Sequence, residues 1–172
     1  MLSDNLTKAL SDQVNAEYYS AYLYLSLSAA AGRLGLKGAA NWLFIQSREE
    51  MAHGTHMYEY ILERGATPSF AAIEQPPALS DGLKEIFEMV LSHEQKVTQR
   101  INALATLAMQ EFDHASYQFM MWYVDEQVEE EAGVNEVLDK LRLIGDNKGL
   151  LLALDNEFAA RVFVPPFPAK TN

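Results

Sequence analysis

The sequence predicts an all-α fold: a four-helix bundle with one long crossover connection and a short fifth helix at the C-terminal end. Four long segments repeat apolar residues with the 3.6-residue period of an amphipathic helix, and no segment shows the two-residue alternation of a strand. One connecting segment, residues 66–80, contains three prolines and cannot be helical, so it separates the four helices into two pairs. Hydrophobic residues make up 49% of the 172 residues, which favours a folded globular chain over a disordered one.

The first pair of helices is delimited by capping residues and glycines. The first helix is expected over residues 5–33, with Ser3 or Asp4 as its N-cap. The second is expected over residues 39–64 and stops at Gly65. Three glycines are expected to break the chain between them: Gly32, Gly35 and Gly38. Because only a few residues join the two helices, we expect them to be antiparallel neighbours.

The second pair of helices follows the crossover segment. Ser80 and Asp81 form a good N-cap pair, and the third helix is expected to start after them and to run to about Met109. The fourth helix is expected to start after Asp113 and to end near Gly145. The short connection again predicts an antiparallel pair.

The length of the crossover segment determines how the two pairs are arranged. Its 15 residues reach about 50 Å when fully extended, whereas the 26 residues of the second helix span about 39 Å. The segment can therefore run the whole length of the bundle, which places the second and third helices parallel to each other.

A shorter fifth helix is expected after Asp146 and Asn147 and before the two prolines at 165–166. The tail, residues 163–172, contains three prolines and is expected to be extended. The fifth helix is apolar on too many sides for an exposed appendage, so we expect it to pack against another subunit. The apolar side chains concerned are Leu150, Leu151, Leu152, Leu154 and Phe158.

Composition and charge narrow the class of protein. The chain has no cysteine, which excludes disulfides and thiolate metal ligation by this chain and fits a reducing cytoplasm. A formal net charge of −11 predicts repulsion from nucleic acids and anionic membranes and attraction of cations. The first ten residues lack a signal-peptide pattern, and no apolar run approaches the ~20 residues of a membrane span. We therefore expect a single cytoplasmic domain over residues 1–172 that binds neither nucleic acid nor membrane.

Four glutamates interrupt the apolar faces of the four long helices, one on each helix. Burying four unpaired carboxylates is too costly, and neither Lys96 nor Arg100 lies on the face of Glu94 to pair with it. Two helices add a second residue of metal-ligand type three positions away, so that the whole set is Glu17, Glu50, His53, Glu94, Gln127 and Glu130. Oxygen ligands with a single imidazole favour iron or manganese. The sequence therefore predicts a binuclear metal site with open positions in the middle of the bundle.

Three further glutamates each lie one residue from a proposed ligand, on facing helices: Glu49, Glu126 and Glu129. This placement favours an additional cation site, whereas the neighbouring Glu131 is expected on a solvated acidic face. Tyr24 lies two helical turns after Glu17 on the same face, where it can donate to a ligand, supply an electron or pack as an ordinary core residue. Other aromatic residues are expected to be structural, with Trp122 in packing and His56, His93 and His114 at the surface.

With these residues in view, the chain closely resembles the non-haem bacterial and archaeal ferritins over its whole length. Three segments carry the resemblance: AEYYS at 16–20, REEMAH at 48–53 and EQVEE at 126–130. The resemblance implies a ferritin-like five-helix subunit that assembles into hollow shells of twenty-four. It also implies a di-iron ferroxidase centre that oxidises Fe(II) with O₂ or H₂O₂, and storage of the ferric product as a mineral inside the shell.

The family's site residues carry over onto the matching positions of this sequence. The resemblance assigns the first iron to Glu17, Glu50 and His53. It assigns the second to Glu50, Glu94 and Glu130, with Gln127 close to the oxidant. A third iron would be held by Glu49, Glu126 and Glu129, with Glu130 shared, and Tyr24 matches the tyrosine that the family keeps beside the centre.

Three alternatives stay open at this point. A di-iron oxidoreductase without a storage role, such as a peroxidase, needs the same ligands but neither the fifth helix nor the third site. A haem-containing bacterioferritin would show Glu-x-x-His where this chain has Gln127-x-x-Glu130, and Met51 is out of register with the haem-ligating methionine, so no haem is expected. The third alternative is a non-catalytic acidic scaffold. The absence of basic partners for the buried glutamates argues against it.

Overall fold

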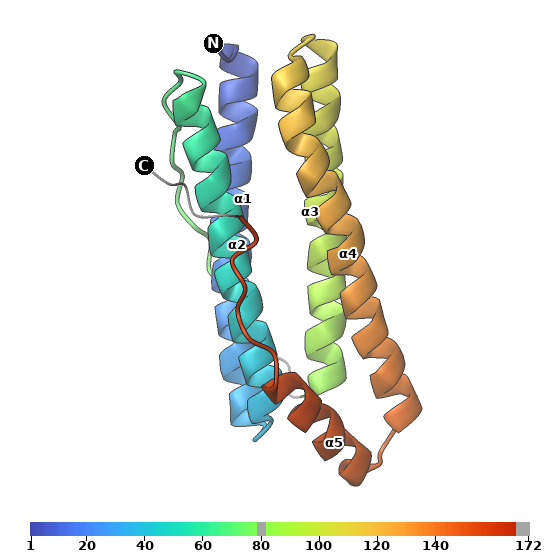
Figure 1. Cartoon of the computed structure of the whole chain (residues 1–172). Helices are drawn as coiled ribbons and strands as arrows, with labels where there is room; N and C mark the ends of the chain where they lie inside the picture. The colour runs from blue at the N-terminus through green and yellow to red at the C-terminus, as the bar shows by residue number, and fades with distance from the viewer. Residues whose placement is uncertain (79–81, 168–172) are drawn as a thin grey trace.

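The computed structural model describes residues 1–78 and 82–167. These residues form five helices and no strand: α1 (Asp4–Arg33), α2 (Lys37–Glu63), α3 (Leu83–Gln110), α4 (His114–Ile144) and α5 (Lys148–Ala159). Figure 1 shows α1–α2 and α3–α4 as two antiparallel hairpins, with α5 lying across one end of the bundle. Helices α2 and α3 run in the same direction, as the crossover length predicts. The predicted all-α bundle with one crossover and a fifth helix is confirmed.

Side-chain caps start three of the helices. The hydroxyl of Ser3 accepts the backbone N–H of Leu6 at 3.0 Å and begins α1. Asp113 accepts the N–H of Ser116 at 2.9 Å at the start of α4. Asn147 caps α5 as predicted. The cap pair predicted for α3, residues 80–81, lies outside the described residues, which resume at Gly82, the position before Leu83.

Of the three glycines predicted to break the chain, Gly35 lies between α1 and α2 as expected, whereas Gly32 lies inside α1 and Gly38 inside α2. Gly35 follows the end of α1 and adopts a φ of 83°, a left-handed backbone conformation that cannot continue the helix. Gly38, by contrast, lies inside α2, which begins at Lys37 and not at residue 39. A Cβ atom at Gly38 would lie 1.6 Å from the backbone oxygen of Asp155 in α5. Position 38 therefore requires glycine because another helix crosses there, and not because a helix ends.

The crossover segment runs along the outside of α1. Residues 66–78 contain neither helix nor strand. The backbone N–H of Ser69 donates to Ser11 Oγ at 3.2 Å, and that of Ala71 donates to Asn15 Oδ1 at 3.3 Å. The segment thus returns along the bundle from the end of α2 toward the start of α3 (Figure 1).

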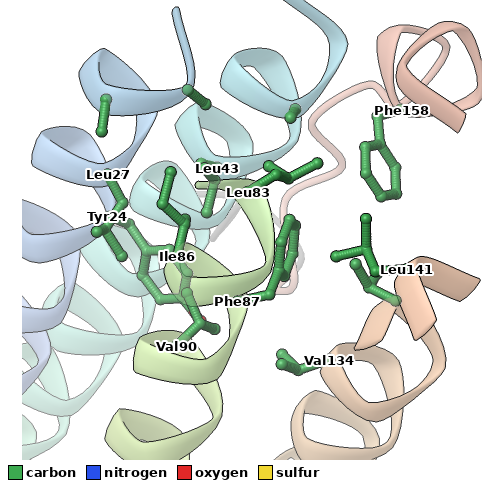
Figure 2. Packing of buried hydrophobic residues seen from close by; sticks show 14 of the residues in the cluster. Tyr24, Leu27, Leu43, Leu83, Ile86, Phe87, Val90, Val134, Leu141 and Phe158 are labelled. Carbon is green, nitrogen blue, oxygen red and sulfur yellow. The ribbon is translucent and has the colours of Figure 1, made fainter. Parts of the chain in front are cut away.

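One side of helix α5 packs against its own chain, whereas the predicted contact with another subunit stays a prediction. The ring of Phe158 lies 5.8 Å from that of Phe87 and 6.3 Å from that of Trp42. Figure 2 shows Phe158 in the same apolar cluster as Phe87 and Leu141. Other apolar side chains of the helix remain exposed to solvent: Leu150 is 51% exposed and Leu152 is 59% exposed.

Helix α5 also completes the start of α2. Leu36 precedes that helix and offers no capping side chain, so the first N–H groups of α2 need another acceptor. Asp155 supplies one, since its Oδ1 accepts the N–H of Ala39 at 2.8 Å. The tail after α5 then runs along α2 without helix or strand as far as residue 167 (Figure 1). The predicted extension beyond that point, residues 168–172, lies outside the described part of the chain.

Two apolar clusters fill the interior of the bundle on either side of a polar layer. One cluster, near α5, includes Tyr24, Phe87 and Val134 (Figure 2). The other, near the opposite end, includes Leu10 and Ile101. Between them, at the middle of each long helix, lie buried polar side chains: Gln13, Glu17, Gln46, Glu50, His53, Glu94 and Gln127. None of the helices that the structure describes is both long and apolar enough to cross a membrane.

Candidate metal centre

Glu17, Glu50 and His53 meet in the polar layer. Each offers one ligand atom, and these atoms all lie within 4.8 Å of one another. All three side chains are buried, and His53 Nδ1 lies 3.5 Å from Glu50 Oε2. A Cβ at Gly54 would lie 3.2 Å from the Cβ of Glu17, so the glycine in α2 allows α1 to approach closely enough to deliver that carboxyl. Sequence reasoning missed this role of Gly54.

Glu94 and Glu130 face this group from α3 and α4. The hydroxyl of Tyr24 donates to Glu94 Oε1 at 2.6 Å, and Gln127 Nε2 donates to Glu94 Oε2 at 3.1 Å. Glu130 is half-buried, and its Oε2 accepts from Gln46 Nε2 at 2.7 Å. The hydrogen bond of Tyr24 to Glu94, a predicted ligand, favours a role at the site over plain packing. Both carboxyls are therefore held in defined orientations.

The four carboxyl groups interact strongly with one another. Burial raises the pKa of Glu50 well above its usual range, and the neighbouring carboxylates raise it further. Burial also raises the pKa of Glu94 to about 7 and that of Glu130 to about 8. Glu17 has a raised pKa for the same reason, although its hydrogen bonds to Gln13 and Glu50 oppose the shift. Near neutral pH the metal-free layer therefore retains protons, which a bound cation would replace.

The imidazole of His53 fits a metal ligand. Burial lowers its pKa to about 4, so the ring is neutral at physiological pH and has a free lone pair. Its Nε2 atom is buried and has no hydrogen-bond partner among the described residues; a carboxylate oxygen of Glu126 lies 3.8 Å away. A buried polar atom without a partner is rare and calls for an explanation such as an ion. The donor set, one imidazole with several carboxylates, suits iron or manganese.

Two arginines are linked to Glu17 and Glu130 by hydrogen bonds through intervening glutamines. Arg100 Nε donates to Gln13 Oε1 at 2.9 Å, and Gln13 Nε2 donates to Glu17 Oε1 at 2.7 Å. Arg161 donates to Gln46 Oε1, and Gln46 in turn donates to Glu130. Sequence reasoning placed Arg100 off the face of Glu94 and did not anticipate either relay. Gln13 could have been found, because it lies four residues before Glu17 on the same helical face, whereas nothing in the pattern indicates Arg161.

The three glutamates predicted to form an additional site line one cavity. Glu49, Glu126 and Glu129 border it together with Glu130, and its volume is about 580 Å³. Glu49 is paired with Arg161 at 2.6 Å. Burial and the nearby carboxylates raise the pKa of Glu126. The solvated face predicted for Glu131 is only partly correct, since that residue is half-buried and accepts from Thr98 Oγ1 at 2.5 Å.

The other aromatic residues divide between confirmed and corrected predictions. Trp122 packs edge-on against His53, with ring centroids 5.5 Å apart, and His114 is exposed as expected. His93 is half-buried, with Nε2 2.8 Å from Ser20 Oγ, and burial lowers its pKa to about 4. His56 is also half-buried, because the tail covers it: its ring stacks on Phe167 at 3.6 Å. The prediction of surface histidines is therefore wrong for these two positions.

A four-helix bundle with a central layer of carboxylates and one neutral imidazole defines a metal-binding helical protein. The ferritin-like domain family matches residues 7–144 of the chain. A bacterial non-heme ferritin of Staphylococcus aureus is 39% identical over 163 residues, which covers 95% of this chain and 98% of that protein.

Solved structures give the same result. An engineered closed form of the Archaeoglobus fulgidus ferritin superposes with a TM-score of 0.94 at 46% identity, over 95% of this chain and 100% of that one. An open-pore ferritin from the same archaeon gives a TM-score of 0.92 at 46% identity, over 94% and 100% of the two chains. The chain belongs to the ferritin-like family, among the non-haem ferritins, which confirms the resemblance found in the sequence.

Proposed function

We propose that this chain is the subunit of an iron-storing ferritin, which oxidises Fe(II) to Fe(III) in the polar layer and retains the ferric product as a mineral. The observation that carries the proposal is the meeting of Glu17, Glu50 and His53 within 4.8 Å, with two further carboxyls opposite. Fe(II) is the substrate in this scheme. The non-heme ferritins and archaeal ferritin structures that the chain matches support the same function.

Two Fe(II) ions would share the layer. Glu17, Glu50 and His53 suit the first ion, and Glu50 with Glu94 and Glu130 suits the second, so that Glu50 lies between them. Each ion would give up one electron; the two electrons and two protons would convert O₂ to H₂O₂, or H₂O₂ to two water molecules. Gln127, whose amide donates to Glu94 at 3.1 Å, would lie close to the oxidant.

The surrounding residues prepare the ligands before substrate arrives. Tyr24 holds one oxygen of Glu94, Gln46 holds one oxygen of Glu130, and Gln13 holds one oxygen of Glu17. Hydrogen bonds of this kind fix the orientation of metal-binding carboxylates and are typically worth 10- to 100-fold in affinity, as an order of magnitude. The protons that the raised pKa values retain on the carboxyls leave as Fe(II) binds, so uptake releases acid.

Three finer assignments belong to the same proposal. The subunits would form a cytoplasmic shell of twenty-four, for which the exposed leucines of α5 offer an additional contact surface. Tyr24 would supply an electron during oxidation from its place 2.6 Å from Glu94. Glu49, Glu126 and Glu129 would hold a third ion, with Glu130 shared. No haem is proposed.

The test is to add Fe(II) in air to the purified protein and follow ferric absorbance, particle size and retained iron. The proposal expects rapid oxidation, a large particle and retention of far more than two irons per subunit. A monomer or dimer that oxidises Fe(II) without retaining it would contradict storage and favour the non-storage oxidoreductase. A Soret band in the protein as purified would instead favour a haem-containing bacterioferritin.

A further inference from the structure

The cavity beside Glu130 is strongly acidic and contains few basic groups. Among its described lining residues are six carboxylates, Glu49, Glu126, Glu129, Glu130, Glu136 and Glu157, and two basic side chains, Lys140 and Arg161. Lys140 pairs with Glu136 at 2.9 Å and with Glu157 at 2.7 Å, at the end of the cavity next to α5. Arg161 is therefore the basic side chain, among the described lining residues, that offsets the negative charge at the end of the cavity nearest the polar layer.

Arg161 is held there by several contacts. One guanidinium nitrogen donates to Glu49 Oε2 at 2.6 Å and also to the side-chain oxygen of Gln46. The guanidinium carbon lies 4.6 Å from the centre of the Trp42 ring. The side chains of Arg161 and Glu49 are only 27% and 16% exposed, so the charge-assisted hydrogen bond is partly sheltered from water.

We propose that Arg161 is a built-in counter-cation of this cavity, so that a metal ion reaches Glu49 only by displacing the guanidinium. The inference rests on the proposed function and concerns how tightly the third ion binds. An arginine cannot leave by losing its proton, because the guanidinium stays charged at any physiological pH. The ion and Arg161 therefore compete for the same carboxylate oxygen. The apparent affinity of the third site is reduced by the fraction of molecules in which Glu49 is free.

The displacement is confined to the side chain. The backbone oxygen of Arg161 accepts from Asn41 Nδ2 at 3.0 Å, and that of Phe158 accepts from the same amide at 3.3 Å. These bonds hold the end of α5 whether or not the guanidinium moves. The contact with Trp42 is lost when it does, which makes the fluorescence of Trp42 a reporter of the competition.

The test is calorimetric titration with Zn²⁺, a redox-inert probe, of the assembled wild-type protein and of Arg161→Gln. We expect the first two binding events to keep their number and the third to tighten about five- to tenfold, because the glutamine no longer competes. Arg161→Lys, which keeps the charge, should stay near the wild-type affinity. The double variant Arg161→Gln, Glu49→Gln should lose the third event, which would place that event at Glu49.

Arg48→Gln is the matched control. Arg48 is exposed and stacks on Phe163 of the same tail, with 3.9 Å between the guanidinium carbon and the ring centre. Its replacement removes one positive charge next to Glu49 without removing the hydrogen bond to that carboxylate. The third-site affinity should therefore change much less than in Arg161→Gln. Equal tightening in both variants would overturn the proposal in favour of a general charge effect.

Fluorescence provides the second readout. In a Trp122→Phe background, saturation of the third site with Zn²⁺ should change the emission of Trp42, and Glu49→Gln should abolish that change. Third-site binding that leaves Trp42 emission unchanged, or an Arg161→Gln variant with wild-type or weaker third-site affinity, would overturn the inference. A wild type that lacks even the first two events would instead contradict the proposed function, so the two failures are distinguishable.

Discussion

Replacing Glu130 with glutamine should stabilise the metal-free protein while removing rapid Fe(II) oxidation. The glutamine has nearly the same shape and can still accept the hydrogen bond that Gln46 donates to Glu130 at 2.7 Å. It cannot carry the negative charge that the neighbouring carboxylates oppose. The same substitution therefore improves the empty site and impairs its function, a combination that a purely structural glutamate would not produce.

The size of the stabilisation follows from the pKa. Burial and Glu94 raise the pKa of Glu130 from 4.5 to about 8, so at pH 7 the folded protein retains a proton that the unfolded chain has lost. Because one pH unit corresponds to about 1.4 kcal/mol, the cost at pH 7 is on the order of 3 kcal/mol. Glu130 is half-buried, so water reduces this cost. We expect a gain of about 1–3 kcal/mol for Glu130→Gln.

Thermal unfolding of chelator-treated protein measures the gain, with Glu131→Gln as the control on the adjacent position. An increase of several degrees is expected at pH 7, and little increase below pH 4.5, where Glu130 is protonated in both states. Stopped-flow ferric absorbance should show Fe(II) oxidation slowed by about 100-fold or more. Changes to residues that only orient metal ligands typically cost about 10- to 100-fold, and Glu130 is itself a proposed ligand. A destabilised Glu130→Gln protein, or one with wild-type oxidation, would refute the reasoning.

Three further predictions test the surroundings of the site. Tyr24→Phe should keep the fold but lose about 1–2 kcal/mol of metal-free stability, because Glu94 loses a buried donor; equal unfolding temperatures would count against that contact. Gly38→Ala should release α5 and make residues 145–160 sensitive to protease, because the new Cβ would lie 1.6 Å from the Asp155 oxygen, whereas Gly133→Ala, with open space around it, should not. Metal-free stability should fall from pH 6.5 to pH 8, because the unfolded chain has already lost the protons that Glu94 and Glu130, with pKa values of about 7 and about 8, still hold in the folded protein; a rise over this range in chelator-treated protein would contradict the shifts.

The proposed inner ligands could be predicted from the sequence because they violate an apolar pattern. Glu50 and Glu94 each occupy a core position of a long helix, and a buried carboxylate requires a partner of opposite charge. The spacing of His53 from Glu50 then fixes which residue shares the face. The bundle could be predicted from a separate observation, since the crossover length leaves one simple arrangement of two hairpins.

The contacts that could not be predicted from the sequence are those made by irregular segments and by helices that cross far from their position in the chain. Arg161 follows the last helix, and no periodic pattern relates it to Glu49, which is 112 positions away. His56 was expected at the surface because it lies off the apolar face of its helix, but the tail brings Phe167 onto it. Gly38 looked like a helix breaker because its real cause, the crossing of α5, is a tertiary contact. A local sequence pattern indicates what kind of partner a residue needs. It does not indicate which distant segment of the chain provides that partner.

The most direct test of the central claim is a crystal structure of the protein exposed to Fe(II) without oxygen, with anomalous diffraction measured on both sides of the iron absorption edge. The account predicts two strong iron peaks in the polar layer, one bound by Glu17, Glu50 and His53 and the other by Glu50, Glu94 and Glu130. An empty polar layer in crystals that hold iron elsewhere would contradict it.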